Sequence, residues 1–253
     1  MFSVSIIAVT MFNVAAVTLG TLAVMLWLRR RGGRWRDFFL GAGIFFLFAM
    51  VLEQMLHQLV LRSPAGPTLQ GSVWLTGLYG GLAAGVFEEV GRFCAFKLVL
   101  RGQRERITAL SYGIGHGGGE AFLLLGMTYI NNLILMFTLS NGGVLPPALD
   151  SAVRGLAAVP VTAYLWALFE RIPAVAFHMS ASVLVFAAAK QPGKLWLFPA
   201  AILLHALLDF TAIVCNAYLP LPVLELLITV FALAVVWLGY RVYNNLQKNQ
   251  EIS

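Results

Sequence analysis

Long apolar runs dominate this chain and constrain its fold more than any other feature. A helix needs about 20 apolar residues to cross a bilayer, and several runs, among them residues 4–28, 38–61 and 221–240, reach that length. Only 11% of the 253 residues are charged, against roughly a quarter in soluble domains. Backbone groups in lipid must be satisfied within the chain, and the alternation typical of barrel strands does not occur here. The sequence therefore predicts an all-α, polytopic transmembrane helical bundle.

We expect one integral membrane domain, residues 1–253, with about seven spans. The spans are predicted at residues 4–28, 38–61, 73–100, 107–139, 172–189, 195–218 and 221–240. The fourth is long for one helix, so it is expected to tilt or to break at its glycines. The apolar stretch 151–169 contains Arg154 and Pro160. It is predicted as a re-entrant or interfacial helix, with an eighth span as the alternative.

The distribution of charge predicts how the bundle is oriented and which partners it has. Lys and Arg outnumber Asp and Glu by 17 to 11, and most of them lie after the first, third and fifth spans or in the tail. By the positive-inside rule, the N-terminus is expected outside and the C-terminus inside. Because the basic residues lie in short loops rather than in a basic arm, no nucleic-acid partner is expected. The expected surroundings are a lipid bilayer, the plasma membrane of a bacterium.

A pair of adjacent carboxylates lies inside the third predicted span. Glu88 and Glu89 point about 100° apart on a helix, and Arg92 is within ion-pairing reach of either one. Ionisable groups inside a membrane cost at least about 2.5 kcal/mol each, so they are candidates for function. We expect one glutamate to pair with Arg92 and the other to serve as a general base. The alternative is a buried ion pair that only holds helices together.

Two further pairs of polar residues have the i, i+4 spacing that shares one helix face. His116 and Glu120 lie in a glycine-rich part of the fourth span, and His205 and Asp209 lie in the sixth. The Asp209 carboxylate is expected to accept a proton from one nitrogen of His205, which leaves the other nitrogen free to face a cavity. The alternative for each pair is a structural hydrogen bond.

Other polar residues are predicted to be structural because they lie near the outer boundary. Glu53 and His57 are expected to have a structural or gating role. Glu170 and Arg171 are expected to be structural.

Depth in the membrane groups four residues from four different spans. At about 1.5 Å per residue, Glu88, Glu120, His178 and His205 lie roughly 15–20 Å from the cytoplasmic ends of their helices. That is near the middle of an apolar core about 30 Å thick. We therefore expect them to meet in a single polar cavity.

Four motifs follow one another in order, each inside an apolar span: Glu88-Glu89-x-x-Arg92, Gly115-His116-Gly117-Gly118-x-Glu120, Phe177-His178 and His205-x-x-x-Asp209. This arrangement resembles the type II CAAX endopeptidase and bacteriocin-processing superfamily, which is described as a group of glutamic-type intramembrane proteases. Within it, the motifs are most similar to those of the YhfC-type membrane peptidases. The resemblance covers residues 80–212 and implies a catalytic core of about residues 73–218.

The resemblance implies a role for each motif. Glu88 would activate water, assisted by His116 or Glu120, and Arg92 would orient Glu89. The oxyanion would be stabilised by His205 with Asp209, and by His178. These roles imply an endopeptidase that acts on a membrane protein or peptide.

Alternatives to a metal-free peptidase follow from the same residues. Several histidines and glutamates can bind zinc, although the sequence contains no His-Glu-x-x-His motif; we expect no cofactor, with zinc as the second possibility. Intramembrane acids and histidines also build proton relays, as in a proton-coupled transporter. They can also order the helices of a non-catalytic membrane scaffold.

Overall fold

The protein is a bundle of helices in the computed structural model, which describes residues 2–144 and 146–251. In chain order the elements are α1 (Val4–Arg29), α2 (Trp35–Phe45), η1 (Phe46–Glu53), α3 (Gln54–Leu61), α4 (Gly66–Gln70), α5 (Val73–Cys94), η2 (Ala95–Val99), α6 (Ile107–Ala121), η3 (Phe122–Gly126), α7 (Met127–Ser140), η4 (Pro147–Leu149), α8 (Asp150–Ala158), α9 (Val161–Lys190), α10 (Leu197–Asn216) and α11 (Leu221–Glu251). Three short segments, η1 to η3, are π-helical and continue the α-helices beside them, whereas η4 is a 3₁₀ turn.

Within the described part of the chain, six helices are long and apolar enough to cross a membrane, which confirms the predicted all-α membrane bundle. They are Val4–Arg29, Trp35–Leu61, Ile107–Ser140, Val161–Lys190, Leu197–Asn216 and Leu221–Leu246. The predicted third span, α5, is not among them, because its carboxylates and glycines lower its mean hydropathy. A count of seven spans is therefore not confirmed.

The stretch 151–169 divides into two parts. Its first part forms the separate short helix α8, none of whose residues is buried. Its second part is continuous with the fifth predicted span and extends α9 to 30 residues. The prediction of one re-entrant or interfacial helix is therefore wrong for the second part. Pro160 lies immediately before the first turn of α9, where its missing N–H leaves no hydrogen bond unmade.

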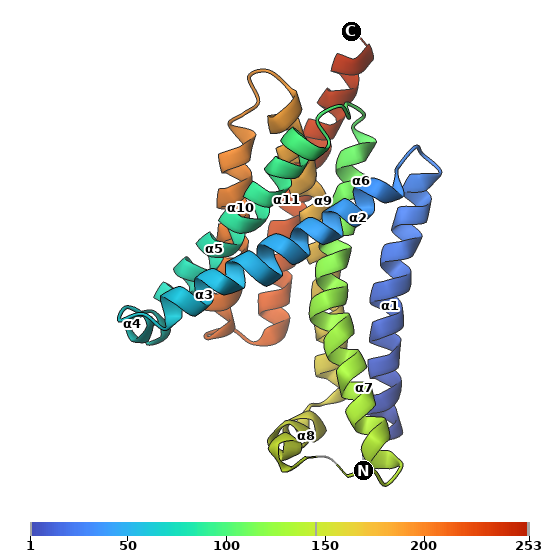
Figure 1. The fold of residues 1–253 in the computed structure, drawn as a ribbon, viewed down its shortest axis with the longest axis vertical. Coiled ribbons are helices and arrows are strands. Elements are labelled where there is room, and N and C mark those ends of the chain that lie inside the picture. The colour runs from blue at the N-terminus through green and yellow to red at the C-terminus, as the bar shows by residue number, and fades with distance from the viewer. Residues whose placement is uncertain (1, 145, 252–253) are drawn as a thin grey trace.

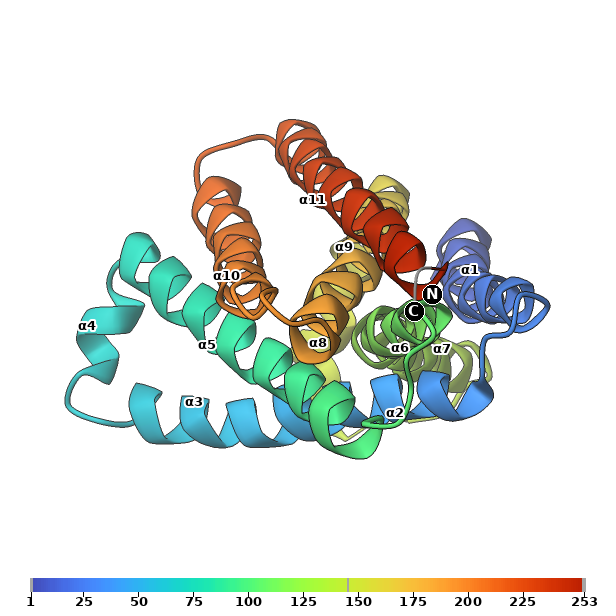
Figure 2. The same ribbon diagram turned by 90° about the horizontal axis from the view of Figure 1, so that it is seen from above.

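Helix α9 is the centre of the bundle. In the apolar 18-residue stretch of α9, 72% of the residues are buried inside the protein, against 17–33% for the corresponding stretches of the other five candidate spans. It packs against α6, α10 and α11, and the view along the bundle shows it between these three helices (Figure 2). The loops that join α1 to α2, α5 to α6 and α9 to α10 lie together at one end, whereas the N-terminus and α8 lie at the other (Figure 1).

Two close helix crossings position the polar residues, and both depend on glycine. A Cβ atom on Gly115 would overlap the carbonyl of Phe38, so α6 can approach α2 only without a side chain there. A Cβ atom on Gly81 would overlap the carbonyl of Ala206 in the same way, where α5 crosses α10. These crossings bring the motifs of α5, α6 and α10 together around α9.

Candidate active site

The polar residues line a cavity of about 280 Å³ inside the bundle. Its walls are formed by Phe45, Ala49, Met50, Glu53, Gln54, Glu88, Glu120, Leu124, Arg171, His178, His205 and Asp209. Four of these, Glu88, Glu120, His178 and His205, come from four different helices. The convergence that their common depth predicted is therefore confirmed.

The two adjacent glutamates have different partners. Arg92 is fully buried, and its Nη1 donates to both carboxylate oxygens of Glu89, at 2.8 and 2.9 Å. Glu88 makes no such pair, and its Oε2 lies 2.8 Å from Nε2 of His116. Glu89 is thus held within the packed core, whereas Glu88 reaches the cavity.

His205 has a different partner from the one that the sequence predicted. Its Nδ1 lies 2.8 Å from Oε1 of Glu89, whereas Asp209 lies 3.7 Å from the other nitrogen, Nε2. The prediction that Asp209 orients His205 is therefore wrong. Spacing along one helix sets only a shared face, and the packing of α5 against α10 brings Glu89 to the Nδ1 side. Nε2 of His205 remains on the cavity side, beside the Asp209 carboxylate.

His178 lies between two other polar side chains. Its Nε2 is 2.5 Å from Oε2 of Glu120, and its Nδ1 is 3.1 Å from Nη2 of Arg92. Arg171 donates from Nη1 to the other oxygen of Glu120, at 3.0 Å, and it also contacts Glu170. The carboxylate of Glu120 is therefore fixed from both sides.

His116 and Glu120 do not act on the same atoms, although they share a helix. His116 is fully buried and contacts Glu88, and it does not line the cavity. Glu120 lines the cavity and contacts His178. Of the two residues left open by the sequence, His116 is thus the direct neighbour of Glu88.

Sequence reasoning missed two members of the site, Arg171 and Glu53, which it placed at the periphery. Both line the cavity. Arg171 precedes His178 by seven residues, or about two turns, and this spacing on one face could have pointed to it. Glu53 ends the π-helical segment η1. A π-helix points its side chains in different directions from an α-helix, and nothing in the sequence indicates that this segment is π-helical.

Three of these side chains have the chemistry and the spacing of a metal site. One ligand atom each of Glu88, His178 and His205 lies within 4.8 Å of the other two. The Glu88 oxygens are 3.8 Å from Nδ1 of His178 and 3.8 Å from Nε2 of His205. Zinc binds nitrogen and oxygen at about 2.0–2.2 Å, which in a tetrahedron separates the ligand atoms by about 3.4 Å.

The second nitrogen of each histidine supports this fit. Nδ1 of His205 is held by Glu89, and Nε2 of His178 lies against Glu120. Metal-binding histidines almost always have such an outer partner, commonly a carboxylate. Arg92 opposes this fit, because its Nη2 competes for Nδ1 of His178. On the whole, the donor set fits a divalent cation such as zinc.

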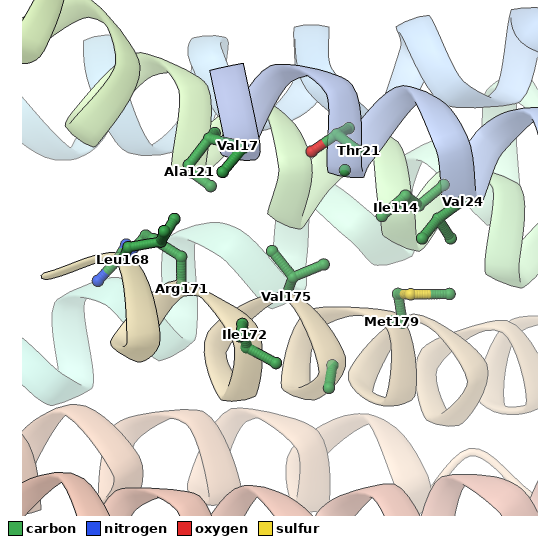
Figure 3. Close-up of a pocket in the computed structure, with 13 residues that line it drawn as sticks. Val17, Thr21, Val24, Ile114, Ala121, Leu168, Arg171, Ile172, Val175 and Met179 are labelled. Atoms are coloured by element: carbon green, nitrogen blue, oxygen red, sulfur yellow. The ribbon is translucent and has the colours of Figure 1, made fainter. Parts of the chain in front are cut away.

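A second cavity, of about 320 Å³, is almost entirely apolar. It lies between α1, α6 and α9, where Val17, Thr21 and Val24 of α1 face Val175 and Met179 of α9 (Figure 3). Arg171 lines both cavities. It is the one residue that the two linings have in common.

Comparison with known proteins identifies the family. A model of the YhfC intramembrane metalloprotease family matches residues 13–232. "Uncharacterized membrane protein YhfC" of Bacillus subtilis (strain 168) is 34% identical over 205 residues, which cover 76% of this chain and 78% of that protein. No solved structure matches the chain. The expectation of no cofactor is not confirmed, because the family description names a metalloprotease. The chain is an integral membrane protein and belongs to the YhfC intramembrane metalloprotease family.

Proposed function

We propose that the protein is an intramembrane endopeptidase that hydrolyses peptide bonds of membrane-associated substrates, with a divalent cation held by Glu88, His178 and His205. The observation that carries this proposal is the grouping of their three ligand atoms within 4.8 Å, with all three residues buried. When bound, the cation would supply Lewis-acid polarisation of the scissile carbonyl and of water. The family description supports the same activity.

The surrounding residues hold the ligands and move protons. Glu89 keeps the proton of His205 on Nδ1, so that Nε2 presents its lone pair to the cavity. Arg92 balances the charge of Glu89. Asp209 presents its carboxylate to the cavity, 3.7 Å from His205 Nε2. It is placed to take a proton from water and to pass it to the leaving nitrogen.

A metal-free mechanism is the second candidate, and one observation favours it. Both nitrogens of His178 already have partners, Arg92 and Glu120. In this version Glu88 is the general base and His116, 2.8 Å away, assists it. A doubly protonated His205, with Nδ1 against Glu89 and Nε2 beside Asp209, then stabilises the oxyanion, as the resemblance to the glutamic-type proteases of the CAAX superfamily implies.

The test compares cells that produce the wild type, His205→Ala or Arg62→Ala at matched levels. New termini of membrane proteins, mapped by mass spectrometry, are expected with the wild type and with the Arg62→Ala control. They are expected to disappear with His205→Ala. Identical termini in all three would contradict the peptidase and favour the scaffold or transporter.

A chelator tests the dependence on metal. Cleavage that a chelator stops and zinc restores would support the metal, whereas cleavage that persists in chelator would support Glu88 as the base.

The apolar cavity gives a prediction about how substrates approach. A side chain at Gly20, which lines this cavity, would meet no atom within 4 Å of its Cβ. Gly20→Leu is therefore expected to fill the cavity without disturbing the fold. It should lower kcat/KM for substrates cut within an apolar segment by about 10- to 100-fold, because one lost apolar side-chain site is worth about 1.5–3 kcal/mol.

The matched control for this prediction is Gly43→Leu. Gly43 is exposed on α2 and also has nothing within 4 Å of its Cβ, so the same added side chain should leave cleavage unchanged. Equal rates for Gly20→Leu and the wild type would show that substrates do not use this cavity.

A further inference from the structure

A chain of three protic side chains leads out of the active-site cavity. Glu53 lines the cavity, and its Oε1 lies 3.2 Å from Nε2 of His57. The other nitrogen of that imidazole, Nδ1, lies 2.8 Å from the hydroxyl of Tyr79. The three residues come from η1, α3 and α5, so the contacts depend on tertiary packing as well as on helix spacing.

Glu53 is buried, whereas His57 and Tyr79 are both partly exposed. The Glu53 side chain is 8% exposed and that of His57 is 21% exposed, and Tyr79 is half-buried. His57 lies four residues before the end of α3 at Leu61. The path therefore runs from the cavity toward the turn where α3 meets α4, away from the loops that join α1 to α2 and α5 to α6 (Figure 1).

Imidazole is suited to passing a proton between these partners. It can accept a proton on one nitrogen and release another from the second nitrogen. A proton from the Tyr79 hydroxyl can enter at Nδ1 while Nε2 passes its own proton to the Glu53 carboxylate, and the Tyr79 phenolate then takes a proton from water at the boundary. The reverse order carries a proton outward. A relay of this kind moves charge without opening a water channel through the apolar bundle.

A hydrolase inside the membrane has a use for such a path. Hydrolysis moves one proton from water to the leaving nitrogen. If the amine departs uncharged, the second proton of that water is released as the new carboxyl group ionises, stays on a cavity carboxylate and must reach bulk water before the next turnover. Glu53 shares its cavity with three acids, Glu88, Glu120 and Asp209, and with the cationic or titratable groups Arg171, His178 and His205.

We propose that Glu53, His57 and Tyr79 form a proton relay between the active-site cavity and the aqueous boundary near α4. The purpose of the relay rests on the proposed peptidase function, whereas its operation does not. His57 and Tyr79 are positioning residues that act through Glu53.

The relay can be tested without any substrate. Purified protein is given a rapid pH drop from a light-released proton, and the carboxyl C=O band of Glu53 is followed by time-resolved infrared spectroscopy. The band is identified by its loss in Glu53→Gln. We expect His57→Ala to slow the protonation of Glu53 about tenfold or more, and added imidazole to restore the rate. Tyr79→Phe, which removes only one oxygen, should also slow it.

Tyr218→Phe is the matched control, because Tyr218 is exposed between α10 and α11. It should leave the rate unchanged. A purely structural role for His57 would lower the unfolding temperature of His57→Ala without slowing Glu53. Unchanged protonation rates in both relay variants would overturn the proposal. A slowed rate in a protein that cleaves no substrate would keep the relay and reject the peptidase, so the two failures are distinguishable.

Discussion

Glu88→Gln is expected to abolish cleavage and to remove the bound metal, whereas Asp209→Asn is expected to abolish cleavage and to leave the metal in place. Glu88 supplies the carboxylate that lies 3.8 Å from a nitrogen of each histidine, and an amide is a far weaker ligand for a divalent cation. Asp209 faces the cavity but is not a member of the three-residue cluster. Loss of a general base lowers the rate by about 10²- to 10⁴-fold.

The measurement is metal content per chain and cleavage rate for the two variants and the wild type, each purified in the same detergent. Gln54→Ala serves as the control, because Gln54 lines the cavity without belonging to the metal cluster. A wild type that cleaves without bound metal, and a Glu88→Gln variant that does not cleave, would exclude the metal mechanism. That result would make Glu88 the general base.

Arg92→Leu is expected to lower the free energy of unfolding by about 3–5 kcal/mol, the usual cost of removing one partner of a buried ion pair. The guanidinium is fully buried and neutralises Glu89, which is fully buried too. Without Arg92, the Glu89 carboxylate keeps only its bond to His205. Leucine fills part of the volume but cannot balance the charge.

Thermal unfolding in nanodiscs checks this expectation. Arg62→Leu, at an exposed arginine, should leave the unfolding temperature unchanged. Adding Glu89→Gln to Arg92→Leu should recover part of the loss, because it removes the uncompensated charge. An Arg92→Leu protein as stable as the wild type would show that the ion pair contributes nothing to the fold.

The sequence predicted the membrane bundle and the meeting of four polar groups because both follow from regular geometry. Apolar length identifies a spanning helix, and rise per residue gives the depth of Glu88, Glu120, His178 and His205. Neither quantity depends on how the helices pack. The contribution of each of the four helices to the cavity could therefore be predicted without a structure.

The partners of each side chain could not be predicted, because they depend on how the helices cross. The i, i+4 rule paired His205 with Asp209. The crossing of α5 and α10 instead places Glu89 in contact with Nδ1 of His205. Arg171 was placed at the membrane boundary from its position in the chain, but the extension of α9 by a whole segment carries it inside.

The number of residues in the π-helical segments determines how the site residues are oriented. η1 ends at Glu53, η2 begins three residues after Arg92, and η3 begins two residues after Glu120. A π turn holds more residues than an α turn, and one residue corresponds to about 100° of rotation around the helix axis. Removing a single residue from η3 would therefore turn every side chain of α7 about a quarter of a circle relative to Glu120. Relatives of this protein can vary the lengths of their loops, but insertions and deletions inside these three segments should be as rare as substitutions of the ligands themselves.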